Sequence, residues 1–66
     1  MKITFSIEEK EVIYQNPWLT DRERKVFDLY YRRGWKIEEV AAEIDMQRSA
    51  VDRALRSIRE KAAKML

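Results

Sequence analysis

Residues 36–58, KIEEVAAEIDMQRSAVDRALRSI, contain the pattern that decides the fold of this chain. Apolar residues recur there at helical spacing (i, i+3, i+4, i+7) in two separate stripes. The stripes consist of Ile37, Val40, Ala41 and Ile44, and of Val51, Ala54, Leu55 and Ile58. A break at Asp45-Met46 separates them. Two short amphipathic helices joined by so short a turn form a helix-turn-helix, in which the helices cross at a steep angle.

A steep crossing requires a small residue where the two helices touch, and Ala41 is placed to be that residue. The other positions that should point inward are all apolar. They are Val40, Ile44, Met46, Val51 and Ala54. The turn itself contains Asp45, a residue type that tolerates the left-handed backbone conformation better than most.

Residues 19–66, LTDRERKVFDLYYRRGWKIEEVAAEIDMQRSAVDRALRSIREKAAKML, resemble region four of bacterial sigma factors. They are similar, more distantly, to the effector domain of response regulators of the LuxR type. The resemblance is carried by Leu19-Thr20, Arg22-Glu23, Val26, Gly34, Glu38-Glu39-Val40-Ala41, Arg48-Ser49, Val51 and Leu55. It implies binding to promoter DNA and contact with RNA polymerase.

The N-terminal residues predict an extended arm followed by a short helix. Ser6 opens a capping box, S-x-x-E, so a helix should begin at Ile7 and run to about Gln15, although its apolar residues form only a ragged stripe. Ile3, Phe5 and Ile7 also alternate with polar residues, as in a strand. A strand this short has no partner within the chain, so it would have to pair with another copy.

A second capping box begins at Thr20 and predicts a helix from Asp21 to about Arg33. Gly34, the only Gly in the chain, is expected at the left-handed position that ends this helix. The inner face of the helix should be formed by Val26, Phe27 and Tyr30.

The two helices of the motif complete the predicted fold. The first should run from about Ile37 to Ile44, and the second from Gln47 or Arg48 to about Lys64. The apolar stripe of the last helix continues along its whole length, so its second half should meet the N-terminal helix or another molecule. The predicted fold class is therefore all-α, a small bundle of about four helices with a helix-turn-helix.

Length and composition narrow the choice of function. The 66 residues show no linker or repeat and predict a single domain, with an arm and short helix over residues 1–16 and the sigma-like core over residues 19–66. The chain has no Cys and no His, and a single Gly, so thiol chemistry, the usual zinc sites and a glycine-rich phosphate loop are excluded. We expect no enzymatic activity and no cofactor. No apolar run of transmembrane length and no signal-peptide pattern occurs, which predicts a cytoplasmic, nucleoid-associated protein without a membrane partner.

Charge is concentrated toward the C-terminus. Residues 1–46 carry eight Lys or Arg and ten Asp or Glu, a net charge of −2, whereas residues 47–66 carry six and two, a net charge of +4. The side of the last helix opposite its apolar stripe should face DNA bases in the major groove, because an α-helix fits that groove. The predicted base-contacting residues are Gln47, Arg48, Ser49, Asp52, Arg53 and Arg56. Among them Asp52 either accepts a hydrogen bond from cytosine or orients Arg48 or Arg56, and we favour the orienting role.

Phosphate contacts should flank the groove. Lys36 lies beside the N-terminus of the helix predicted over residues 37–44, whose free N–H groups could bind a phosphate. The predicted phosphate-contacting residues are Arg32, Arg33, Lys36, Arg59 and Lys61. Each of these has an alternative role as a solubilising surface cation.

The sequence therefore predicts a sequence-specific regulator of transcription, bacterial or phage, that binds double-stranded DNA. A single module of this size buries little DNA surface, so specificity should need a homodimer or attachment to RNA polymerase. Two alternatives stay open. One is a protein-interaction module, such as an anti-sigma factor or a polymerase-binding factor, and the other is an accessory of phage DNA packaging.

Overall fold

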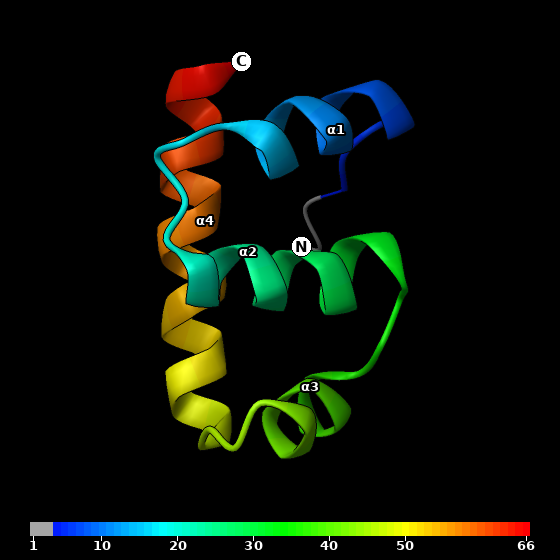
Figure 1. The fold of residues 1–66 in the computed structure, drawn as a ribbon, viewed down its shortest axis with the longest axis vertical. Helices are drawn as coiled ribbons and strands as arrows, with labels where there is room; N and C mark the ends of the chain where they lie inside the picture. Colours follow the sequence, from blue (N-terminus) through cyan, green and yellow to red (C-terminus); the bar gives the residue numbers. More distant parts are fainter. Residues whose placement is uncertain (1–3) are drawn as a thin grey trace.

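A computed structural model of the chain describes residues 4–66. Over these residues it contains four α-helices, one π-helix and no strand. The helices, labelled in Figure 1 except for the π-helix, are α1 (Ile7–Gln15), α2 (Asp21–Phe27), η1 (Asp28–Arg32), α3 (Ile37–Glu43) and α4 (Arg48–Met65). The all-α prediction is confirmed. The predicted pairing of Ile3 as a strand lies outside the described residues.

Helix α4 is the axis of the molecule. Its 18 residues, at about 1.5 Å per residue, span roughly 27 Å, close to the longest dimension of 29 Å. Helix α3 contacts it near its N-terminus, α2 contacts it at mid-length and α1 contacts it near its C-terminus (Figure 1). The second half of α4 therefore meets α1, as one of the two predicted alternatives required.

Both predicted capping boxes are present. The hydroxyl of Ser6 accepts a hydrogen bond from the N–H of Glu9 at 3.1 Å, and the Glu9 carboxylate accepts one from the N–H of Ser6 at 2.8 Å. Thr20 and Glu23 make the same pair of bonds at 3.1 and 2.9 Å. Each box satisfies N–H groups that have no partner within the helix, which is why α1 and α2 begin where the sequence predicts.

Two residues with a left-handed backbone conformation follow the ends of helices. Gly34 follows η1, and Asp45 lies in the turn after α3. Gly34 has φ +76° and Asp45 has φ +54°. After Gly34 the N–H of Trp35 donates to the carbonyl of Leu29 at 2.9 Å, and after Asp45 the N–H of Met46 donates to the carbonyl of Ala41 at 2.9 Å. Both predicted left-handed positions are confirmed.

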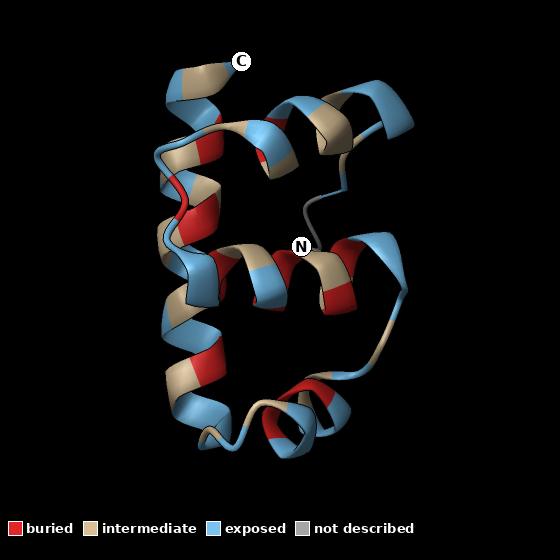
Figure 2. Ribbon diagram, viewed as in Figure 1, coloured by how far each residue is buried: buried red, intermediate tan, exposed pale blue. Residues whose placement is uncertain are grey.

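The core is formed by one face of α4 and the helices packed across it (Figure 2). Its buried α4 residues are Val51, Leu55 and Ile58 of the predicted stripe and Ala62 further along the helix, all at most 2% exposed, whereas Ala54 of the stripe is only half-buried. The largest side chain that is fully buried is that of Phe27 in α2. Full burial of an aliphatic or aromatic side chain contributes about 1.5–3 kcal/mol, so this shared core is the main stabilising feature.

The π-helix η1 corrects the predicted inner face of the second helix. The N–H of Arg33 donates to the carbonyl of Asp28, five residues earlier, at 2.9 Å. A turn closed at i→i+5 holds one residue more than an α-helical turn, so the side chains after Asp28 rotate away from their α-helical directions. Leu29 and Tyr31 are buried as a result, whereas Tyr30 is only half-buried.

Residues 4–6, the described residues before α1, form no strand, and Phe5 among them packs against the core. Phe5 lies against Phe27 and Tyr31, with ring centroids 6.3 and 5.2 Å apart. Within α1 itself, Ile13 is fully buried, whereas Ile7 is 81% exposed. The apolar pattern of α1 did not distinguish these two isoleucines, because the helix packs through only one narrow edge.

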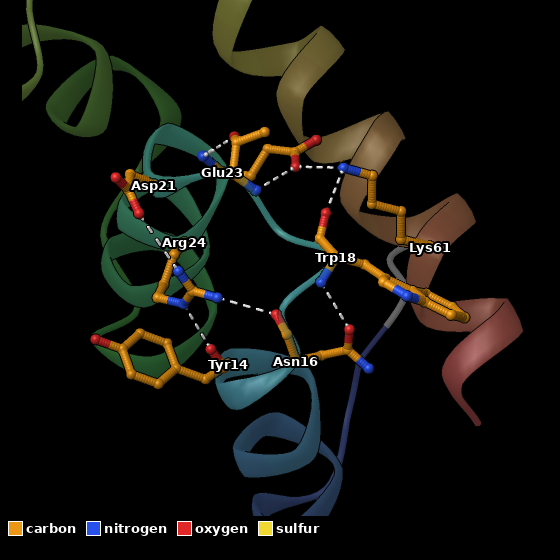
Figure 3. A network of polar contacts seen from close by, with 8 residues as sticks. Tyr14, Asn16, Trp18, Asp21, Glu23, Arg24 and Lys61 are labelled. Carbon is orange, nitrogen blue, oxygen red and sulfur yellow. Dashed lines mark hydrogen bonds and ion pairs between the residues drawn. The ribbon is translucent and has the colours of Figure 1, made fainter.

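Polar contacts fasten α1 to the rest of the fold (Figure 3). The Arg24 guanidinium donates through Nε to the carbonyl of Tyr14 at 2.8 Å and through Nη2 to the carbonyl of Asn16 at 2.9 Å. These carbonyls lie at the C-terminal end of α1, where backbone acceptors lack helical partners. A side chain of α2 therefore caps α1 and sets the position of the N-terminal helix.

Candidate nucleic-acid interface

The helix-turn-helix is made by α3, the turn after it and α4. Val40 and Val51 are fully buried where the two helices meet, and Ala41 beside them is 8% exposed. Ala41 thus belongs to the same buried core, and we expect a larger side chain at position 41 to hold the helices apart. The turn residues Ile44 and Met46 are half-buried against the same core.

All six predicted base-contacting side chains are exposed on the structure. They belong to the N-terminal half of α4 and the residue that precedes it, and they are Gln47, Arg48, Ser49, Asp52, Arg53 and Arg56. Because a helix turns about 100° per residue, burial of Val51, Leu55 and Ile58 directs the opposite side of α4 into solvent. We call these six residues the α4 polar face.

Within the part of the chain that the structure describes, most of the α4 polar face has no fixed partner. Arg53, Arg56 and Asp52 form no ion pair there. Arg48 differs, because its Nη1 lies 3.1 Å from Oε1 of Glu38 on α3. The predicted orientation of Arg48 or Arg56 by Asp52 is therefore absent, and Glu38 is the carboxylate that contacts Arg48.

The N-terminus of α3 does not fit the phosphate contact predicted for it. Oε1 of Glu39 accepts a hydrogen bond from the N–H of Lys36 at 2.8 Å, so a carboxylate of the chain itself occupies this end. Glu38, Glu39 and Glu43 are all exposed on α3, and their charge repels a phosphate. The side chain of Lys36 stays exposed beside this acidic helix.

Two of the predicted phosphate-contacting cations are bound within the molecule. Arg32 lies 2.9 Å from Glu11 and 3.2 Å from Asp28, and its guanidinium is 4.2 Å from the centroid of the Tyr14 ring. Nζ of Lys61 contacts the carboxylate of Glu23 and the backbone carbonyl of Trp18. A phosphate contact from either cation would break these bonds, so we leave Arg32 and Lys61 out of the interface.

Arg33 and Arg59, two more of the predicted phosphate-contacting cations, keep accessible side chains. Arg33 lies 3.2 Å from Asp28, but its side chain is 61% exposed. Arg59, three residues beyond Arg56 on α4, is half-buried and forms no ion pair among residues 4–66. Together with Lys36 they are the predicted phosphate-contacting cations that remain accessible.

A buried carboxylate locks α2 against α4 (Figure 3). Glu23 accepts hydrogen bonds from Nζ of Lys61 at 2.6 Å and from the hydroxyl of Ser57 at 2.7 Å, in addition to its capping bond with Thr20. Lys61 also donates to the carbonyl of Trp18 at 2.9 Å. The network joins the first turn of α2 to the second half of α4.

The same network perturbs the ionisation of Glu23. Burial of the carboxyl group by itself raises its pKa, but the hydrogen bonds from Lys61, Ser57 and the N–H of Thr20, together with the charge of Lys61, more than offset burial and lower the pKa from 4.5 to about 2. Sequence reasoning assigned Glu23 only to a capping box and missed its partners on α4. The available signal was Ser57 and Lys61, four residues apart beside the apolar stripe of α4.

Residues 3–65 match the protein family described as "Putative helix-turn-helix protein, YlxM / p13 like". The chain belongs to this family. The match includes α1, which the resemblance to sigma region four leaves out, and the contacts of Arg24 described above join α1 to α2. A comparison with curated proteins and a comparison with solved structures gave no match.

Two features are absent over residues 4–66. No three side chains of the types that bind metal ions come together over this range. None of its helices has the length and apolar character needed to cross a membrane.

Proposed function

We propose that this protein is a sequence-specific, DNA-binding regulator of transcription that places the N-terminal half of α4 in the major groove. One observation carries the proposal. All six side chains of the α4 polar face are exposed on a helix whose other side is locked into the core. Membership in a helix-turn-helix family supports the same kind of ligand. The proposed activity is binding, without catalysis.

The chemistry of the α4 polar face suits base edges. Arg can form paired hydrogen bonds with guanine, Gln can do so with adenine, and Ser can bond several edges or a phosphate. Arg53 and Arg56 supply two guanidinium groups from one side of α4, without intramolecular ion pairs among residues 4–66. Asp52, the residue before Arg53, can accept from the amino group of cytosine.

The flanking cations would contact the backbone of the duplex. Lys36, Arg33 and Arg59 remain accessible after the intramolecular contacts are taken into account. Such contacts position a protein on DNA and supply affinity that falls with salt, but they do not read sequence. The net charge of +4 over residues 47–66 favours this attachment.

We further propose that the protein acts with a second copy or on RNA polymerase. A single small module buries about 600–1,000 Å² on DNA and binds weakly. The resemblance to sigma region four supports attachment to polymerase. A homodimer would instead read two half-sites about one helical turn apart, and selected sequences with twofold symmetry would support that arrangement.

The test is duplex binding measured by fluorescence anisotropy against salt concentration, followed by selection from random duplexes. We expect the R53A/R56A variant to lose about tenfold or more in affinity for the selected site, because a paired Arg–base contact contributes about 1–3 kcal/mol of discrimination. The matched control is Lys10→Ala, which removes a cation from α1, at the end of the molecule away from α3 (Figure 1). Equal binding by R53A/R56A and the wild-type protein would refute the proposal and favour a protein-interaction module.

A further inference from the structure

One ion pair joins the two helices of the motif at the leading end of α4. Nη1 of Arg48, the first residue of α4, lies 3.1 Å from Oε1 of Glu38, the second residue of α3. Among the described residues it is the only ion pair that reaches the α4 polar face. Its position therefore asks for an explanation.

Stability of the fold does not explain this pair. The two side chains are 64% and 62% exposed, and ion pairs so exposed contribute little to folding. Arg48 also lies in the first turn of α4, where the helix dipole disfavours a cation. A carboxylate supplied by α3 compensates for that placement and lets a guanidinium stay at the end of the helix that enters the groove.

The geometry leaves most of the guanidinium available. An Arg side chain has five N–H donors in a planar fork, and the contact with Glu38 involves a single nitrogen, Nη1. The remaining donors, on Nη2 and Nε, form the edge that can pair with O6 and N7 of guanine. Glu38 thus holds Arg48 from one side while the opposite edge is open to a base.

We propose that Glu38 is a positioning residue that determines specificity, holding Arg48 toward a guanine edge and away from the neighbouring phosphates. This inference rests on the proposed function. Without the carboxylate, the flexible Arg48 side chain can turn to a phosphate, and phosphate contacts carry no sequence information. The negative charge of Glu38 also repels the duplex backbone, so it lowers non-specific affinity while it sharpens the choice of base.

The experiment compares Glu38→Gln with Glu43→Gln on the site selected by the wild-type protein. Both variants remove one exposed carboxylate from α3, but Glu43 has no ion pair among residues 4–66. The base pair read by Arg48 is the one at which Arg48→Ala loses discrimination. At that pair we expect Glu38→Gln to reduce the preference for guanine about fivefold or more, at the lower end of what a paired Arg–guanine contact supplies, whereas Glu43→Gln keeps the wild-type preference. Both variants should bind unrelated duplexes more tightly.

A double variant completes the test. In the Arg48→Ala background, Glu38→Gln should leave base preference unchanged, because the residue that it positions is gone. The inference is overturned if Glu38→Gln keeps the wild-type preference at that pair, or if Arg48→Ala changes preference at no pair. These results leave the proposed function standing when R53A/R56A still loses binding, and only wild-type binding by R53A/R56A refutes the function itself.

Discussion

Replacement of Glu23 by Gln should destabilise the protein in a way that depends on pH. Glu23 is 9% exposed and accepts bonds from Lys61, Ser57 and Thr20. Gln has nearly the same shape and retains one oxygen acceptor, so the change mainly removes the negative charge that Lys61 contacts. The perturbation is therefore electrostatic, with little change in packing.

The magnitude follows from the pKa of this carboxyl group. This pKa is about 2 in the folded protein, whereas its ordinary value is 4.5. Each unit of difference between the two pKa values corresponds to about 1.4 kcal/mol of stability. Because the folded-state pKa is the lower one, the stabilisation is complete above pH 4.5 and is lost as the pH falls toward 2. The wild-type protein should exceed Glu23→Gln by about 3 kcal/mol in free energy of unfolding at pH 7, and by less than half of that near pH 3.

The assay is urea denaturation followed by circular dichroism, at several pH values from 3 to 7. The quantity of interest is the difference between wild type and variant, since the titration of other carboxylates cancels in it. Glu60→Gln, an exposed replacement on α4, is the matched control and should differ from wild type by a small amount at every pH. In a Lys61→Met background the difference caused by Glu23→Gln should be smaller, because the largest of the bonds that lower the pKa is absent.

One result would refute this reasoning. If the gap between wild type and Glu23→Gln stays constant from pH 3 to pH 7, the folded protein does not hold the pKa of Glu23 below its ordinary value. The loss in stability would then come from packing or from the capping bond alone. An equal pH-dependent gap for Glu60→Gln would likewise contradict a local origin in the Glu23 network.

Two further predictions concern the packing of the motif and the residue that precedes it. Ala41→Leu should lower the free energy of unfolding by about 1–3 kcal/mol or more, because the added atoms force α3 away from α4. Ala42→Leu, at the exposed neighbouring position, should be tolerated. Equal urea midpoints for the two variants would contradict a close contact of α3 and α4 at position 41. Gly34→Ala should lower the free energy of unfolding by about 1 kcal/mol, because a φ of +76° is strained for residues with a side chain. Gly34→Asn should lower it less, since Asn tolerates this conformation better. Thermal melting of both variants checks this order.

The predictions that held were those that depend on short stretches of sequence. Ser6 and Thr20 begin helices because their hydroxyls accept from an N–H three residues later, and Gly34 ends a helix because of its own backbone freedom. The inward stripe of α4 was read from its period alone. Once that stripe is known, the outward direction of Arg53 and Arg56 follows from helix geometry. The exposure of the candidate interface could therefore also be predicted from the sequence.

The sequence by itself determined where the α-helices begin, except that it did not predict the π-helix η1, and it determined the helix-turn-helix and the side of α4 that faces solvent, since each depends on residues at most a few positions apart. Only the tertiary structure decided which cations stay available. Arg32 is bound by a carboxylate 21 residues away and Lys61 by one 38 residues away, and Arg48 is met by a glutamate on the other helix of the motif. Pairings of this kind depend on how the helices cross, and charged residues on a helical surface carry no local pattern that identifies their distant partners.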